Sequence, residues 1–319
     1  MSGALWGTLA GFGFGLFQSL NRRALQGMEV MASSFLQLLL STVVLVAIAA
    51  VAEDEGALAR APTGSLVAFG LAGFVHFFLG WTLLNLSQKR IGAARTGPLL
   101  ATTPLFATAI AAVTLAEVPT AVTLAGVAIT VWGVLVLSGE GPAAVEGAGG
   151  EEEGALEVEP AAGRGEGRVA VLAGGRLALA PALGTALCWA VSPVFIRAGL
   201  RGLPSPLLGV ALSMVVASAA YGLVVALRGR SLGLRRIPRG SLAFKAVAGL
   251  LVGLSTWARW IALGRAPVAV VLAVNSVSVP TVMLLAPVLM GRHLERVTLR
   301  LWAGAALVVG GSLILILWG

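Results

Sequence analysis

The sequence predicts an all-α integral membrane protein with ten transmembrane helices, arranged as two inverted five-helix repeats. Three observations lead to this fold class: the composition, a succession of long apolar runs, and a second half that repeats the first. Of the 319 residues, 58% are hydrophobic and 11% are charged, and the mean hydropathy is +0.95. Because a soluble domain carries about 25% charged residues, the composition excludes a soluble protein.

Each predicted helix is an apolar run, and crossing a bilayer takes roughly 20 mostly apolar residues. Short polar segments separate the runs, such as "QKRIG" after the third run and "GRHLER" before the tenth. The first run follows no basic segment and no clear cleavage site, so we expect a retained span and not a signal peptide. The predicted spans cover residues 3–20, 30–52, 65–87, 93–115, 119–138, 179–199, 205–227, 241–263, 267–289 and 297–318.

A long segment between the fifth and sixth runs divides the chain. Residues 139–178 are rich in Gly, Ala and Glu, with eight acidic residues against three arginines. The segment has no apolar periodicity and cannot bury enough surface to offset its ordering entropy. We therefore predict a first five-helix repeat at 1–138, a disordered acidic linker at 139–178 and a second five-helix repeat at 179–319.

The two halves resemble each other in order and spacing. Four matches share an offset of 176 residues, and after a two-residue slip four more share an offset of 178. Because five spans is an odd number, the second copy must cross the bilayer in the opposite sense. Inverted repeats are a recurrent transporter architecture, with the substrate site near the midplane between the halves. The matched residues are Trp81, Lys89, Ala93, Pro104, Glu117, Thr120, Gly126 and Gly133 with Trp257, Arg265, Ala269, Pro280, Glu295, Thr298, Gly304 and Gly311.

Two long blocks carry a resemblance to a known family. They are "LGWTLLNLSQKRIGAARTGPLLATTPLFATAIAAVTLAEVPTAVTLAGVAITVWGVLVLSG" and its echo "STWARWIALGRAPVAVVLAVNSVSVPTVMLLAPVLMGRHLERVTLRLWAGAALVVGGSLIL". Each has a short connection, a proline in mid-helix, a glutamate at a helix end and a final span with spaced glycines. The chain resembles the drug/metabolite transporter superfamily, specifically its ten-span bacterial permeases with two EamA domains. The resemblance implies a secondary carrier of small metabolites, often an exporter of amino acids or similar compounds.

Arg259 is the most informative single residue, because it lies between two tryptophans inside an apolar run. An arginine near the bilayer centre costs roughly 2.5–3.5 kcal/mol on insertion scales. One interpretation is a cationic anchor for a substrate carboxylate or phosphate, which guanidinium suits. The other is snorkelling, because Arg259 lies about 9 Å below Arg265 along the helix. The sequence leaves both open.

His76 is the only histidine inside a predicted span. It could relay protons, because the ordinary pKa of histidine is near 6.5, or it could be a neutral imidazole bonded to a neighbouring helix. The remaining substrate-binding candidates are polar or aromatic residues in spans, several of them beside a mid-helix proline that frees a backbone carbonyl. They are Gln18, Trp81, Thr103, Trp257, Asn275 and Ser278.

The acidic residues narrow the substrate class. All fourteen lie in loops, in the linker or at span ends. The small multidrug resistance relatives use a glutamate in the first span to exchange protons for cationic drugs, and this chain has Gln18 there. We therefore expect a neutral, zwitterionic or anionic substrate, with proton coupling left open.

Other classes of protein fit the sequence less well. A membrane-embedded lipid-modifying enzyme would need clustered acids or histidines, and a lipid-flipping or accessory subunit would not need a duplicated ten-span chain. No basic face interleaved with aromatics indicates nucleic-acid binding. We expect no enzyme activity, no catalytic residues, no metal and no cofactor. The expected partners are a small-molecule substrate and the lipid bilayer, in a monomer or homodimer of the bacterial cytoplasmic membrane.

Two arguments disagree about orientation. The first, third, seventh and ninth separators hold fourteen Lys and Arg when Arg95, Lys245 and Arg300 are counted as loop charges, and the others apart from the linker hold four. The positive-inside rule then places the linker in the cytoplasm and both termini outside. The resemblance implies both termini inside, so the sequence leaves orientation open.

Overall fold

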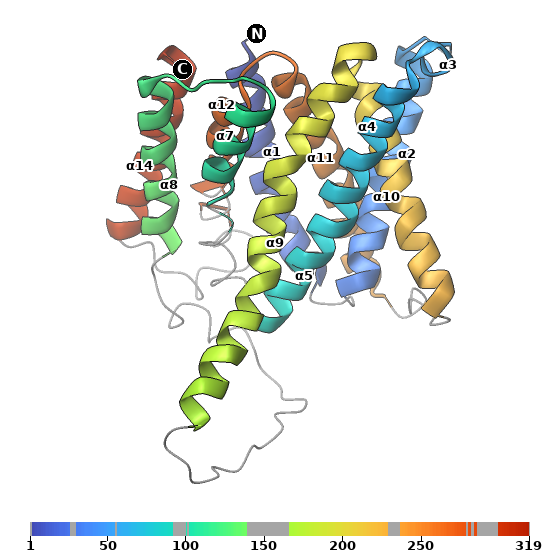
Figure 1. Cartoon of the computed structure of the whole chain (residues 1–319). Helices are drawn as coiled ribbons and strands as arrows, with labels where there is room; N and C mark the ends of the chain where they lie inside the picture. Colours follow the sequence, from blue (N-terminus) through green and yellow to red (C-terminus); the bar gives the residue numbers. More distant parts are fainter. Residues whose placement is uncertain are drawn as a thin grey trace.

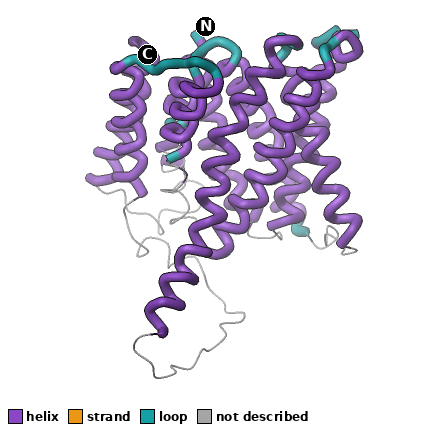
Figure 2. Tube along the Cα trace, in the orientation of Figure 1, coloured by secondary structure: helices purple, strands orange, loops and turns teal. Residues whose placement is uncertain are grey.

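The structure is a computed structural model, and it describes residues 2–25, 30–54, 56–91, 100, 102–138, 166–228, 237–278, 280–281, 284–285 and 299–318. Every regular element within these residues is a helix (Figure 2). The prediction of an all-α fold is therefore confirmed for the described part of the chain.

Within its described residues, the first half contains four long helical segments and two shorter helices. One of the long segments is continuous but changes its winding, because α4, η1 and α5 follow one another without a break. Prolines mark two starts: Pro62 precedes α4, and Pro104 is in the first turn of α7, where proline costs no helical hydrogen bond. The bounds are α1 Gly3–Leu25, α2 Val30–Ala52, α3 Ala57–Arg60, α4 Thr63–Gly73, η1 Phe74–Leu79, α5 Gly80–Ile91, α7 Thr103–Thr114 and α8 Ala121–Ser138.

The second half repeats this pattern. Its helices are α9 Glu166–Gly202, α10 Pro206–Arg228, α11 Arg239–Leu263, α12 Val268–Asn275 and α14 Leu299–Trp318. The helix α9 begins at Glu166, inside the segment predicted as a linker, and residues 139–165 lie outside the described residues. Pro238 and Pro267 precede α11 and α12 as Pro62 precedes α4.

Five of the described helices are long and apolar enough to cross a membrane: 31–52, 63–84, 180–202, 206–227 and 239–263. Three shorter apolar helices cover 103–114, 121–136 and 302–318. Exposed side chains on these helices are largely apolar, such as Val43, Leu71 and Leu187, as lipid-facing surfaces require. The chain is therefore a multi-pass membrane protein, while the exact number of ten spans stays a prediction.

The two halves run in opposite directions. Both termini lie at the end of the bundle that carries α3, which we call the terminal end (Figure 1). The first helix, α1, runs away from this end, and α9, the first helix of the second half, runs towards it (Figure 1). The opposite end, where α1 and α10 finish and α11 begins, is called the basic end, since arginines 22, 23, 228 and 239 lie there.

Helix contacts are exchanged between the halves. The helix α1 packs against α11 and α12, and its counterpart α9 packs against α4, α5 and α7. The helix α2 packs against α10, and α8 packs against α14, so each of these four contacts its own counterpart. The main core cluster draws on both halves, from Leu38 and Phe69 to Met214 and Trp260. The structure therefore consists of two interlocked repeats.

Glycines bring α8 and α14 close together. A Cβ on Gly133 would lie 2.9 Å from the carbonyl oxygen of Gly304, and one on Gly311 would lie 2.9 Å from that of Gly126. Larger residues would push the two backbones apart, as in other small-residue membrane interfaces. These four glycines are the ones that the repeat matches at an offset of 178.

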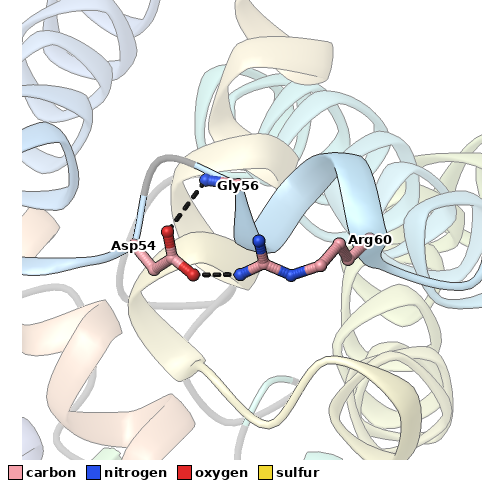
Figure 3. A network of polar contacts seen from close by, with 3 residues as sticks. All are labelled: Asp54, Gly56 and Arg60. Atoms are coloured by element: carbon pink, nitrogen blue, oxygen red, sulfur yellow. Dashed lines mark hydrogen bonds and ion pairs between the residues drawn. The ribbon is translucent and has the colours of Figure 1, made fainter.

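A turn at the terminal end connects α2 to α3. The carboxylate of Asp54 accepts a hydrogen bond of 3.0 Å from the backbone N–H of Gly56 and forms an ion pair with Arg60 (Figure 3). These two donors hold the pKa of Asp54 below its ordinary value of 3.8. Nearby, the hydroxyl of Ser205 donates a 2.6 Å hydrogen bond to Glu53, which links the end of α2 to the start of α10.

Candidate functional site

The Arg259 side chain points into the bundle. It lies on α11, and only 6% of it is exposed. Its Nη2 atom lies 2.7 Å from Nε2 of His76, and its Cζ atom lies 5.6 Å from the centre of the Phe14 ring. Both partners belong to the first half, so the guanidinium lies between the two halves and does not extend along α11 towards Arg265.

A π-helical segment positions His76. In η1 the backbone is wound more loosely than in an α-helix, and such segments free backbone carbonyls at functional sites. The His76 carbonyl accepts a hydrogen bond of 3.3 Å from Nε1–H of Trp189 on α9. The Trp189 ring also stacks on the imidazole, with ring centres 5.7 Å apart. Gly80 leaves room for this indole, because a Cβ there would lie 2.7 Å from its Nε1.

The hydrogen bonds of His76 define its protonation state in this arrangement. Guanidinium can only donate, so Nε2 of His76 must accept from Arg259 through a lone pair. The other nitrogen, Nδ1, lies 2.8 Å from Oγ of Ser192 and carries the proton that it donates there. Ser192 then donates to the Trp189 carbonyl oxygen at 3.3 Å. A neutral imidazole thus connects Arg259 on α11 to Ser192 on α9.

The positive charge of Arg259 is not matched by an acid within the described residues. The ion pairs found there join Arg60 to Asp54 and Arg197 to Glu117. The Nε atom of Arg259 also has no hydrogen-bond partner in this part of the chain. The charge is met by a neutral imidazole and an aromatic face, which stabilise a cation less than a carboxylate does. The site therefore retains capacity for an anion.

A chain of aromatic side chains leads away from the Arg259–His76 pair. The Trp81 ring stacks on Phe17 with centres 6.1 Å apart and meets the edge of Phe77 at 6.4 Å. Phe77 in turn contacts His76 edge-on at 4.8 Å. Trp81 is thus connected to the Arg259–His76 pair through one intervening ring. Its repeat counterpart, Trp257, is half-buried on α11 and packs against the main core cluster.

Gln18 lies on α1 opposite the helix's exposed apolar stripe. It follows Phe14 by one turn, and its side chain is exposed. It lies across the helix from the exposed apolar stripe that faces lipid, because two residues turn an α-helix by about 200°. Gln18 therefore lies on the same side of α1 as Gly7 and Gly11 and away from that stripe. The stripe consists of Leu5, Leu9, Phe12 and Leu16.

Asn275 and Ser278 lie along the glycine face of α1. A Cβ on Gly11 would lie 2.9 Å from the carbonyl oxygen of Asn275, and one on Gly15 would lie 2.9 Å from that of Ser278. The Oδ1 atom of Asn275 is buried without a partner among the described residues. Thr103, by contrast, donates locally to the carbonyl oxygen of Leu100 at 2.6 Å. The helix α1 thus connects Arg259, through Phe14, with Asn275 and Ser278.

Several residues of the site are absent from the sequence-based prediction. Trp189 and Ser192 fall in the sixth predicted span, where "CWAVSPVF" reads as ordinary apolar helix. Lys245 was counted as a loop charge, yet it is 1% exposed. An available signal was its position: Lys245 and Arg259 are 14 residues apart, which puts them on nearly the same face of one helix.

The terminal end is held by an ion pair between the halves. The Nη2 atom of Arg197 on α9 lies 2.9 Å from Oε1 of Glu117, and Oε2 of Glu117 accepts from the backbone N–H of Val268 at 2.8 Å. Arg197 also donates to the carbonyl oxygen of Ala266. A cavity of about 200 Å³ opens beside this pair, lined by Leu115, Glu117, Arg197, Leu200, Arg201 and Gly264.

Comparison with known proteins identifies the family to which this architecture belongs. The model of the EamA-like transporter family matches residues 1–139 and 176–317, which is most of the chain. The chain belongs to the EamA-like transporter family. The two matched segments correspond to the two halves of the bundle, and membership makes the chain a membrane transporter. Within the described residues, no three His, Cys, Asp or Glu side chains gather as a metal site requires.

Solved structures share the fold of this EamA-like transporter. One, described as "Crystal structure of protein", superposes with a TM-score of 0.69 at 20% sequence identity. The match covers 98% of this chain and 99% of that one, so the whole bundle is similar. No curated protein matches the chain.

Proposed function

We propose that this EamA-like transporter is a ten-span secondary carrier that exports a small polar metabolite, such as an amino acid or organic acid. The substrate binds through its carboxylate to Arg259, between the two inverted repeats at 1–138 and 179–319. The observation that carries this proposal is the buried guanidinium of Arg259, which has no acidic partner among the described residues.

A carboxylate suits this position better than other small ligands do. Guanidinium binds planar anions through two parallel hydrogen bonds. The guanidinium here has one neutral acceptor, His76, and an Nε–H without a partner within the described residues. A substrate carboxylate would supply both charge and acceptors. Phe14 and Trp81, both partly exposed, supply apolar surface for the rest of a small metabolite.

The exchange of helix contacts between the halves supports alternating access. In inverted-repeat carriers, one repeat rocks against the other around a fixed site near the midplane. Arg259 and Ser192 belong to the second repeat, while His76 and Phe14 belong to the first. Motion between the repeats would therefore change the surroundings of the guanidinium directly.

The hydrogen bond between Arg259 and His76 supports a proposal of proton coupling. A protonated imidazole has donors on both nitrogens, so it cannot accept from the guanidinium. Protonation of His76 would release Arg259 for the substrate, and a bound carboxylate would offset the repulsion between the two cations. Binding of proton and carboxylate would then favour each other, because such coupling is reciprocal. We place the carrier in the bacterial cytoplasmic membrane as a monomer or homodimer.

The test is transport in proteoliposomes containing the full-length protein. A panel of amino acids and organic acids is offered, and uptake is compared for the wild type, Arg259→Gln and Arg259→Lys. We expect the wild type to carry at least one carboxylate. Arg259→Gln should lower its kcat/KM at least tenfold, about 1.4 kcal/mol of lost binding, while Arg259→Lys retains part of the activity.

Arg265→Gln is the matched control. Arg265 is exposed at the end of the same helix, so the variant loses the same charge without touching the site. Equal activity in Arg259→Gln and Arg265→Gln would contradict a role for Arg259 in substrate binding. Transport of lipophilic cations but not carboxylates would contradict the proposed substrate class.

A further inference from the structure

Lys245 is a second buried cation of the bundle. It lies on α11 near the basic end and is 1% exposed. Its ammonium donates to Oδ1 of Asn21 on α1 and, at 2.7 Å, to Oε1 of Gln37 on α2. Both acceptors are neutral amides, and Lys245 has no carboxylate partner among the described residues. Three helices thus meet around a buried positive charge.

The hydrogen-bond donors at this position are not fully used. Gln37 is 1% exposed, and its Nε2 atom has no partner within the described residues. An ammonium has three N–H donors, of which the amides of Asn21 and Gln37 take two. Buried polar groups are almost always satisfied. The unused N–H of the Gln37 amide and the third N–H of the Lys245 ammonium lie side by side. Together they form a pair of donors suited to the two oxygens of a carboxylate.

The repeat relates this cluster to the ion pair at the terminal end. Asn21 and Arg197 are 176 residues apart, the offset of the internal repeat. At the terminal end Arg197 has a carboxylate partner, Glu117. At the basic end Asn21 is neutral and the cation is Lys245 from α11. The acceptors of Lys245 within the described residues are amides, and Glu295, the repeat equivalent of Glu117, lies outside the described residues.

Lys245 and Arg259 lie on the same side of α11. Their separation of 14 residues corresponds to nearly four turns, about 21 Å along the axis. Phe14 contacts Arg259 and Asn21 contacts Lys245, so α1 follows the same path. Gln18 lies between these two α1 residues in the chain, and its side chain is exposed. The two buried cations therefore lie at two levels of one helix interface.

We propose that Lys245, Gln37 and Asn21 form a second carboxylate-binding station, at the basic end of the transport path. The substrate carboxylate replaces the amide of Gln37 as a partner of Lys245 when it passes between Arg259 and that face of the membrane. This inference rests on the proposed function, because it assigns a route to the same substrate class. A purely structural cluster that ties α1, α2 and α11 together is the alternative.

Gln37→Glu separates the two accounts. The new carboxylate is tethered beside Lys245 and occupies the station permanently. We expect transport of the panel carboxylate to fall at least tenfold, while the thermal unfolding midpoint stays equal to that of the wild type or rises. A structural cluster would be strengthened by the new ion pair and would leave transport unchanged. Wild-type transport in Gln37→Glu would therefore overturn the proposal.

Gln37→Met is the matched neutral control. It changes the same position without adding a charge, so it removes one hydrogen-bond partner and leaves Lys245 available. We expect its transport rate to stay at least fivefold above that of Gln37→Glu. If the two variants are equally impaired, the defect comes from loss of the glutamine and not from an occupied station, and the proposal is wrong.

A binding measurement tests the station even if no panel compound is transported. The Arg259→Gln protein in detergent is unfolded thermally while sodium acetate replaces sodium chloride at constant ionic strength. A ligand that binds only the folded state raises the midpoint, so acetate should raise it in Arg259→Gln and not in Arg259→Gln/Gln37→Glu. Equal shifts in both proteins would overturn the station. Absent transport together with a selective acetate shift would contradict the carrier function alone.

Discussion

The hydroxyl groups of Thr42 and Ser218 lie 2.9 Å apart, and the two residues are separated by 176 positions in the chain. This is the offset that matches the two halves in sequence. Thr42 lies on α2 and Ser218 lies on its counterpart α10, so a residue contacts its own repeat equivalent. Two equivalent points can touch only near the axis that relates the halves. The pseudo-two-fold axis therefore passes between α2 and α10 at this hydrogen bond.

This position predicts where a cross-link is tolerated. If the second transport state is the first with the roles of the repeats exchanged, the distance between equivalent residues is the same in both states. Thr42→Cys/Ser218→Cys, made in a Cys188→Ala background because Cys188 is the single cysteine, should form a disulfide. We expect the oxidised protein to transport within about twofold of the reduced protein, measured in proteoliposomes before and after reduction.

An off-axis pair provides the control. Glu117 and Arg197 close the terminal end across the halves, and Asn21, the repeat equivalent of Arg197, lies at the basic end. Glu117→Cys/Arg197→Cys, joined by a short bifunctional thiol reagent, should therefore lose at least tenfold of its transport on cross-linking. Inhibition of the Thr42/Ser218 pair to the same extent would show that the halves do not exchange roles about this axis.

The glycine contact between α8 and α14 predicts a stability difference. A Cβ on Gly133 would lie 2.7 Å from the backbone nitrogen of Val308, and backbone cannot move aside as a flexible side chain can. We expect Gly133→Ala to lower the free energy of unfolding by about 1–3 kcal/mol, the usual cost of overpacking. Gly310→Ala on α14 is the control, since a Cβ there has nothing within 4 Å. It should be neutral or stabilising by up to about 1 kcal/mol. Unfolding titrations in detergent measure both, and equal effects would contradict the close approach.

The turn at Asp54 predicts a local pH dependence. Its pKa is lowered by the Gly56 N–H and the Arg60 guanidinium, so the charged carboxylate is favoured in the folded turn. The stabilising contribution is fully present above about pH 4, the ordinary range for aspartate, and is lost as the pH falls through the lowered pKa. Amide hydrogen exchange at Gly56, corrected for intrinsic rates, should therefore quicken below that range in the wild type. In Asp54→Asn the exchange rate at Gly56 should not increase over this pH range. An increase of the same size in that variant would mean that another group causes the effect.

Much of the helix pattern could be predicted from sequence, because apolar runs and proline or arginine boundaries are local signals. The repeat offset also predicted which residues are equivalent. It could not predict that Thr42 and Ser218 touch, because both are ordinary hydroxyl residues in apolar helices. The start of α9 at Glu166 was also missed, because Gly174 and Gly175 lower local helix propensity.

The candidate site was predictable residue by residue but not as an arrangement. Arg259 and His76 stand out because charged and titratable groups are costly in a span. Their contact joins positions 183 residues apart and depends on the π-helical winding of η1, for which "FVHFFL" gives no local signal. Lys245 was misplaced for a related reason: its acceptors, Asn21 and Gln37, are neutral amides on two other helices, and neither marks a cation site in sequence.

The neutral imidazole between Arg259 and Ser192 predicts how transport depends on pH. In this arrangement Nε2 of His76 accepts from Arg259, and a proton on that nitrogen removes the acceptor and frees the guanidinium. Carboxylate transport by the wild type should therefore rise, by about threefold or more, as the pH falls from 8 to 5.5, because a bound carboxylate offsets the repulsion between the protonated imidazole and Arg259. Initial rates in proteoliposomes of equal internal and external pH measure this without a proton gradient.

His76→Gln tests the same point from the other side. Its amide oxygen can still accept from Arg259 and its N–H can still donate to Ser192, but it has no titratable group. The transport rate of the variant should vary less than about 1.5-fold over this pH range. At pH 5.5 it should be lower than the wild-type rate. The substrate is chosen with a carboxyl pKa below 4, so that its own charge is constant throughout. A wild-type profile that is flat, or one that His76→Gln reproduces, would remove the proton from the mechanism and leave His76 as a neutral support for Arg259.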